Sequence, residues 1–228
     1  MVLALIVIGG ILALAFLPSM WVRSVIKRHA AERADFPGTG GQLARHLLDG
    51  MKLTHVKVEQ TDLGDHYDPI EKVVRLTADH MHKKSLSAVV IAAHEVGHAM
   101  QDATDYPPLR ARTKLAKQAH RVEILGSVLM LLSPLMLLIA KAPAIMIAQL
   151  AAGVIILAFS VLMHTVTLPV EYDASFNRAL PVLKAGNIIA DRDMVSARQI
   201  LRAAALTYVA AAAMTLLDIT RWLRVLRF

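Results

Sequence analysis

Residues 88–101 read AVVIAAHEVGHAMQ and contain the pattern His94-Glu95-x-x-His98. On a helix, residues four apart lie on one face, so both imidazoles can bind one metal ion. Glu95 lies about 100° further around the helix, where its carboxylate can reach a water molecule beside the metal without binding the metal itself. The pattern is typical of zinc hydrolases, and we expect the rest of the chain to be arranged around this helix.

The residues around this pattern favour a helix. Ser85 or Ser87 can cap its start, residues 86–93 form an apolar run that can bury it, and Tyr106-Pro107-Pro108 can end it. Gly97 leaves room between the histidines for a neighbouring backbone or a substrate. The same residues also fit a buried helix whose two histidines are only hydrogen-bonded, so the rest of the sequence has to separate the two interpretations.

The 228 residues are 56% hydrophobic and only 5% aromatic, and the formal net charge is +7. A soluble domain is about 45–50% apolar, so the composition favours membrane segments. Basic residues are scattered among acidic ones without an aromatic platform, which argues against a nucleic-acid partner and for attraction to anionic lipid. Because the chain has no cysteine, a zinc site must use histidine and carboxylate.

Hydrophobic runs divide the chain into five regions. We predict a first transmembrane helix over residues 1–21, a zincin-like catalytic part over 22–121, a transmembrane helical hairpin over 122–168, a helix with a further metal ligand over 169–202 and a C-terminal apolar helix over 203–228. The last apolar run, residues 203–217, is short for a complete span. The predicted fold is mainly α with a small β-hairpin or sheet, in a multi-pass membrane protein.

The polar part before the histidine helix has an α+β pattern. Residues 39–49 are typical of a short helix ended by Gly50, residues 53–59 alternate as in a strand, and residues 65–76 form a hairpin around Pro69. Metallopeptidases commonly hold an extended substrate against a sheet edge. The hairpin is therefore either a substrate-binding edge or an ordinary cover for the helix.

The predicted pair of spans returns the chain to the side it left, so residues 22–121 and 169–202 share one aqueous face. Lys141 alone lies at the opposite turn, whereas nine cations lie near the shared face: Arg23, Lys27, Arg28, Arg33, Arg110, Arg112, Lys114, Lys117 and Arg121. The positive-inside rule therefore predicts that the site faces the cytoplasm.

Catalytic zinc needs a third protein ligand. Asp102 and Asp105 lie one to two turns beyond His98, past the metal. The longer pattern His-Glu-x-x-His-x-x-Gly-x-x-His is absent, because Gln and Thr stand at its glycine and third histidine. A glutamate from a later helix remains. Glu171 is the best candidate because it follows a predicted membrane helix on the shared face, although a solvated interfacial acid also fits that position.

Further stretches carry a resemblance to a known family. Around AAHEVGHAMQ (92–101) lie TDLGDHYDP (61–69), VVRL (73–76), LPVEYDAS (168–175) and AAALTYVA (203–210). With these motifs the chain resembles, over nearly its whole length, the YugP-type neutral zinc metallopeptidases of bacterial membranes. These are distant relatives of the HtpX-like peptidases in the gluzincin class. Several separate motifs in one order are far more specific than the five-residue pattern alone.

The resemblance implies one catalytic Zn²⁺ on His94, His98 and Glu171, with Glu95 as general base, in a multi-pass protein of the bacterial inner membrane. In HtpX-like and thermolysin-like enzymes, an aspartate four residues after the glutamate ligand orients a zinc histidine. Here Ser175 stands at that position. We assign Asp173 a role in orienting the ligands, with a different geometry.

We therefore predict a zinc-dependent membrane endopeptidase that cleaves membrane or unfolded proteins near the bilayer. Glu95 takes a proton from water and returns it to the leaving amine. A cationic or phenolic group should stabilise the oxyanion, and the candidates are His66, Tyr67, Tyr172 and Arg178. The alternatives are a membrane scaffold or adaptor with a structural zinc site, and a zinc hydrolase that acts on lipid or small amides. Neither the natural substrate nor the oligomeric state follows from the sequence.

Overall fold

The computed structural model describes residues 16–140, 151, 155, 159, 162, 163 and 165–216. Residues 16–28 and 165–172 are helical. The other elements, in chain order, are α2 (Gly40–Gly50), β1 (Lys57–Gln60), β2 (His66–Asp68), β3 (Val73–Leu76), α3 (Ala78–His82), α4 (Leu86–Ala103), α5 (Pro107–Ala140), the π-helix η1 (Asp173–Ala179), α7 (Leu180–Ala185), the 3₁₀-helix η2 (Asp191–Asp193) and α8 (Met194–Leu216).

α4 is the helix predicted around the two histidines, and local hydrogen bonds fix both of its ends. Ser85 caps the start, because its Oγ accepts a backbone N–H of the first turn at 3.2 Å. The helix ends at Ala103 because Asp105 adopts a left-handed conformation with φ of 52°. Pro107 then begins α5, as proline is well accepted in the first turn of a helix.

The three strands form a mixed sheet in the order β1-β3-β2. β2 pairs antiparallel with β3, which confirms the predicted hairpin around Pro69. β1 pairs parallel with β3, and it begins at Lys57, later than predicted. Its start is delayed because Leu53 still donates a hydrogen bond to the carbonyl of Leu48 and so closes the end of α2. In the described part of the chain β2 has a strand neighbour on one side only, so it is an edge strand.

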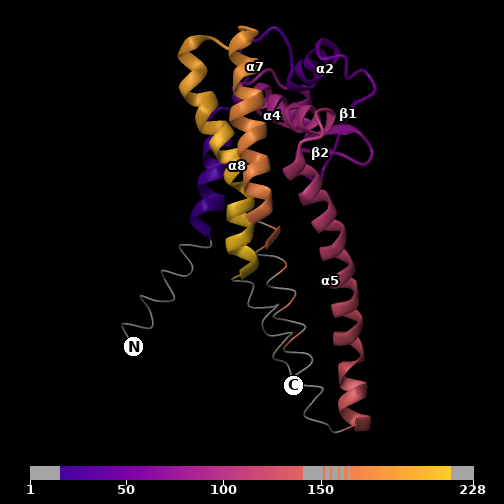
Figure 1. Ribbon diagram of the computed structural model, residues 1–228. Coiled ribbons are helices and arrows are strands. Elements are labelled where there is room, and N and C mark those ends of the chain that lie inside the picture. The colour runs from indigo at the N-terminus through magenta and orange to yellow at the C-terminus, as the bar shows by residue number, and fades with distance from the viewer. Residues whose placement is uncertain are drawn as a thin grey trace, which may run out of the picture.

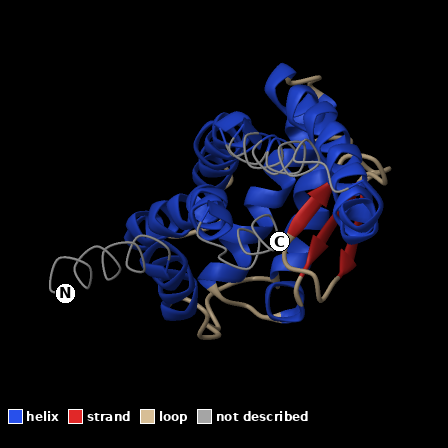
Figure 2. Ribbon diagram, turned by 90° about the horizontal axis from the view of Figure 1, so that it is seen from below, coloured by secondary structure: helices blue, strands red, loops and turns tan. Residues whose placement is uncertain are grey.

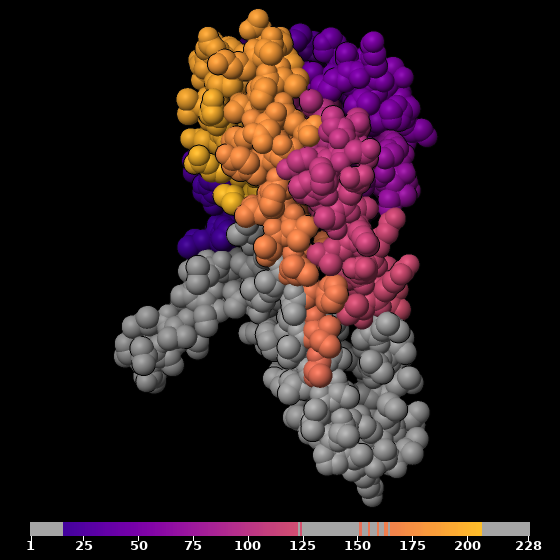
Figure 3. All heavy atoms as spheres, viewed as in Figure 1, coloured from indigo at the N-terminus to yellow at the C-terminus, as the bar shows by residue number. Residues whose placement is uncertain are grey.

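One hydrophobic core joins segments from both ends of the chain. Val90 and Val96 of α4 are buried with Leu48 of α2, Leu183 of α7 and Ile200 of α8. α4 crosses the upper body in Figure 1, while α5 leaves it as one long helix. The strands lie together at one side of the helices in Figure 2. Figure 3 shows atoms from the early, middle and late described residues packed side by side in the upper body.

The prediction of a multi-pass membrane fold is wrong for the part of the chain that the structure describes. None of the helices there combines the length and the apolar composition needed to cross a bilayer. The first half of α5 carries five cations: Arg110, Arg112, Lys114, Lys117 and Arg121. Most of the predicted spans over residues 1–21 and 144–168 lie outside the described residues. The mainly helical fold with a small sheet is confirmed.

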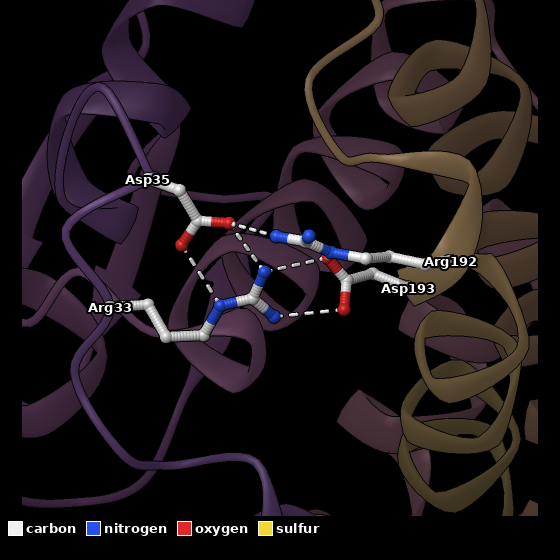
Figure 4. Close-up of polar contacts among 4 residues, drawn as sticks. All are labelled: Arg33, Asp35, Arg192 and Asp193. Atoms are coloured by element: carbon white, nitrogen blue, oxygen red, sulfur yellow. Dashed lines mark hydrogen bonds and ion pairs between the residues drawn. The ribbon is translucent and has the colours of Figure 1, made fainter.

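An ion-pair cluster joins the segment before α2 to the loop before α8 (Figure 4). Arg33 contacts Asp35 at 2.6 Å and Asp193 at 2.8 Å, and Arg192 contacts Asp35 at 2.8 Å. The guanidinium of Arg33 donates to both carboxylate oxygens of Asp193, each at 2.8 Å. The cluster therefore fixes the start of α8 against a segment 160 positions earlier in the chain.

Candidate metal centre

Three buried side chains from two distant segments meet at one point. The ligand atoms of His94, His98 and Glu171 all lie within 4.8 Å of one another. Oε2 of Glu171 lies 3.2 Å from Nε2 of His94 and 3.3 Å from Nε2 of His98. Two ligands of a tetrahedral zinc ion with bonds of about 2.0–2.1 Å are themselves about 3.3 Å apart. The donor set therefore fits one metal ion.

His94 is oriented by a residue of the π-helix. Oγ of Ser175 lies 3.0 Å from Nδ1 of His94, and the same Oγ donates to the carbonyl of Leu201 in α8 at 3.2 Å. Because the hydroxyl gives its own hydrogen to Leu201, it accepts the hydrogen on Nδ1 of His94. Nε2 of His94 is then the unprotonated nitrogen, and it faces Glu171. Ser175, four residues after Glu171, thus orients His94.

His98 is oriented by Gln101, one turn later on α4. Oε1 of Gln101 lies 2.9 Å from Nδ1 of His98. The amide Nε2 of Gln101 donates to the carbonyl of Val170 at 2.7 Å and to Oδ2 of Asp173 at 2.9 Å. We predicted that Asp173 orients a metal ligand, and it does so through one intervening residue. Asp173 accepts a hydrogen bond from Gln101, and Gln101 in turn contacts His98. Arg178 also donates to Asp173, at 2.7 Å.

The π-helix η1 packs against α4 at the position of Gly97. A Cβ atom on Gly97 would lie 2.6 Å from the carbonyl oxygen of Ala174, closer than real Cβ atoms approach an oxygen. Glycine is therefore required here because the two backbones touch. π-helical turns are rare and often occur at functional sites. This one begins two residues after Glu171 and carries Ser175 to His94.

Glu95 and Glu171 have opposite shifts of pKa. Burial raises the pKa of Glu95 to about 7, although the neighbouring His94 acts in the other direction. Burial also acts to raise the pKa of Glu171, but the charges and hydrogen bonds of His98 and His94 outweigh it, so that pKa lies well below its usual range. The carboxylate of Glu171 is thus ionised, as binding of a metal ion requires, whereas Glu95 can exchange a proton near neutral pH.

The metal centre opens into a cleft of about 360 Å³. Apolar side chains of the helix at residues 16–28, of α4 and of α8 line it, together with the segment that leads into β2. The lining residues are Val22, Ile26, Leu63, Gly64, Asp65, His66, Tyr67, Ile91, His94, Glu95, His98, Arg112, Glu171 and Ala204.

Of the four predicted oxyanion candidates, His66 and Tyr67 line this cleft and the other two do not. The hydroxyl of Tyr67 donates to Oδ2 of Asp102 at 2.6 Å. Burial and then this bond raise the pKa of Tyr67 above its usual value. Tyr172 is 57% exposed and packs on Phe176. Arg178 is committed to Asp173, so His66 is left as the best-placed of the four.

Comparison with known proteins agrees with a metal site formed by His94, His98 and Glu171. The family described as "Putative neutral zinc metallopeptidase" matches residues 4–227. The chain belongs to this family. It is also 33% identical over 220 residues to the "Putative membrane protease YugP" of Bacillus subtilis, covering 94% of this chain and 92% of the relative. No solved structure matches.

Membership of a zinc metallopeptidase family identifies the metal that His94, His98 and Glu171 can bind as a single zinc ion. The sequence did not reveal Gln101 or Arg112 as neighbours of the metal ligands, and it pointed to the position of Ser175 while the orienting role was assigned to Asp173. Gln101 lies three residues after His98, a spacing that places it on the same helix face and that could have identified it. Arg112 carries no such signal, because its place in the cleft depends on how α5 packs.

Proposed function

We propose that this chain is a zinc endopeptidase of the HExxH-plus-glutamate type, in which His94, His98 and Glu171 bind the metal and Glu95 is the general base. The observation that carries the proposal is the meeting of three buried metal-ligating side chains in the cleft that also contains Glu95. A structural zinc site has four protein ligands. The described residues supply three ligands beside an open cleft, which favours catalysis instead.

Zinc, when bound, polarises the scissile carbonyl and makes water more acidic. Side chains of the cleft transfer the proton and stabilise the oxyanion. Glu95 takes the proton from the attacking water and passes it to the leaving amine, and a pKa of about 7 suits both transfers. Nδ1 of His66 lies 2.8 Å from the carbonyl of Gly64, so it carries a hydrogen. Nε2 of His66 can then donate to the oxyanion when the ring is protonated.

The edge strand β2 suits an extended substrate. β2 is at the end of the sheet order and carries His66 and Tyr67, which line the cleft. A peptide that adds to this edge would run past the metal ligands with its backbone hydrogen-bonded to β2. Leu63 and Ile70, on either side of β2, are 90% and 68% exposed. We expect them to contact apolar side chains of unfolded or membrane proteins, where such side chains are accessible.

We extend membrane association to this chain because its relative from Bacillus subtilis is called a membrane protease. Phe16, Leu17, Met20 and Trp21 are exposed on the helix at residues 16–28. Arg23 follows them, an arrangement typical of contact with anionic lipid. Co-sedimentation with anionic and neutral vesicles tests this association. The cytoplasmic orientation of the site stays a prediction.

Two substitutions test the enzymatic assignment. Glu95→Gln should keep zinc and lose cleavage of an unfolded protein such as casein, because the metal ligands remain while the base is gone. Glu171→Ala should lose zinc. A Glu95→Gln protein that cleaves as fast as wild type, a Glu171→Ala protein that keeps all its zinc, or turnover of lipid without any turnover of casein would each refute the proposal.

A further inference from the structure

The two carboxylate oxygens of Glu171 face different partners. Oε2 lies between the two histidines, 3.2 Å and 3.3 Å from their Nε2 atoms. Oε1 points away from them and lies 3.3 Å from Nη1 of Arg112. The carboxylate is almost completely buried. Among the described residues Oε1 has no hydrogen bond of good geometry, so the guanidinium is the charged group that faces it.

Arg112 comes from α5, none of whose described residues belongs to the candidate ligand set. It lies in the second turn of α5, 14 positions after His98, and its side chain is 21% exposed while it lines the cleft. A guanidinium keeps its charge at all accessible pH values and carries its N–H groups in a rigid plane. It can therefore hold one oxygen of a carboxylate in place permanently.

We propose that Arg112 is a positioning residue that holds Oε1 of Glu171, so that only Oε2 is presented to the metal. The proposal rests on the proposed function, since it takes His94, His98 and Glu171 as the ligands. A carboxylate can bind a metal ion through one oxygen or both. If both oxygens of Glu171 turned to the metal, they would occupy a position that a catalytic zinc needs for water. Arg112 favours binding of the metal through one oxygen. If Oε1 turned to the metal, the charged guanidinium of Arg112 would lose its contact with this oxygen.

The role differs from that of an oxyanion donor. A group that contacts only the transition state changes kcat and leaves metal affinity unchanged. A residue that acts through Glu171 changes the affinity and the coordination of the metal even when no substrate is present. Partners that orient metal ligands typically change metal affinity by about 10–100-fold when they are removed. The two roles can thus be separated without measuring cleavage.

The experiment uses the full chain with Arg112→Gln, Arg112→Lys and the control Arg110→Gln. Arg110 lies two residues earlier on α5, its side chain is 65% exposed, and it faces Asp105 at 3.7 Å. Zinc affinity is measured by competition with a chromophoric chelator, and the visible spectrum of the Co²⁺-loaded protein reports the coordination number. Circular dichroism confirms that each variant is folded.

We expect Arg112→Gln to weaken zinc binding by about 10–100-fold and to change the Co²⁺ spectrum toward a higher coordination number. Arg112→Lys should recover part of both effects, and Arg110→Gln should show neither. Unchanged affinity with an unchanged spectrum would overturn the proposal. Loss of cleavage in Glu95→Gln tests the proposed function separately.

Discussion

Oγ of Ser175 lies 3.0 Å from Nδ1 of His94 and accepts its hydrogen. The hydroxyl donates a hydrogen bond to the carbonyl of Leu201 in α8. α8 therefore helps to fix the imidazole, although none of its described residues is a candidate metal ligand. A neutral serine, four residues after Glu171, thus orients this histidine.

Ser175→Ala should weaken zinc binding by about 10–100-fold, because the ring of His94 loses the acceptor that fixes its orientation. Chelator competition measures the change. Ser19→Ala is a suitable control, since Oγ of Ser19 donates to the carbonyl of Phe16 in its own helix at 2.9 Å. Equal zinc affinities for wild type and Ser175→Ala would show that the hydrogen bond is dispensable.

Gly97→Ala should destabilise the protein by about 1–3 kcal/mol, because its Cβ would meet the Ala174 carbonyl at 2.6 Å and push η1 from α4. Glu171 and Ser175 would move with η1, so zinc affinity should fall too. Gly50→Ala is the matched control, as nothing lies within 4 Å of its added Cβ. Chemical denaturation measures both variants, and a Gly97→Ala protein as stable as Gly50→Ala would contradict the close backbone contact.

Tyr67→Phe should cost about 1 kcal/mol of stability and leave kcat within about threefold of wild type. The hydroxyl of Tyr67 is used structurally, in a 2.6 Å hydrogen bond to Asp102, which also contacts Lys72 at 2.5 Å. These contacts tie the edge strand β2 to α4. A drop in kcat of a hundredfold or more, with zinc affinity retained, would instead identify Tyr67 as an oxyanion donor.

The ion-pair cluster of Figure 4 should make stability depend on pH in the acid range. Hydrogen bonding to Arg33 lowers the pKa of Asp35 to about 2, and it lowers the pKa of Asp193. A carboxylate whose folded-state pKa is depressed stabilises the fold above its unfolded value, near 3.8. This contribution is lost as the pH falls from there toward about 2.

Asp193→Asn tests this pH dependence by thermal unfolding. At pH 7 the variant should be less stable than wild type by about 1 kcal/mol or less, as is usual for partly exposed pairs. The difference should shrink as the pH falls below about 3, where the wild-type carboxylates become protonated. Asp191→Asn, an exposed neighbour in η2, should show no such difference. A gap that stays constant between pH 7 and about pH 2 would argue that Asp193 acts through packing and not through charge.

The sequence predicts local elements correctly where interactions between residues close in sequence determine them. The histidine helix, its cap at Ser85 and the hairpin around Pro69 depend on neighbours within a few residues. The pairing of β1 with β3 and the position of Arg112 depend on how distant elements pack, for which the sequence carries no local signal. Glu171 was reached by elimination, 73 positions from His98. Membrane spans were inferred from composition, and the helices of the described residues do not support them.

The edge strand β2 is only three residues long, and if substrates add to it as we propose, this length limits what the cleft can take. A peptide would have to arrive already extended to pair with such a short edge, and a natively folded protein rarely has a free segment of that kind. Digestion of a folded substrate would then follow how often that substrate opens locally. Each additional 1.4 kcal/mol of local stability in the substrate would slow its cleavage about tenfold. Which proteins are cleaved would then depend more on how often a substrate opens locally than on its amino-acid sequence.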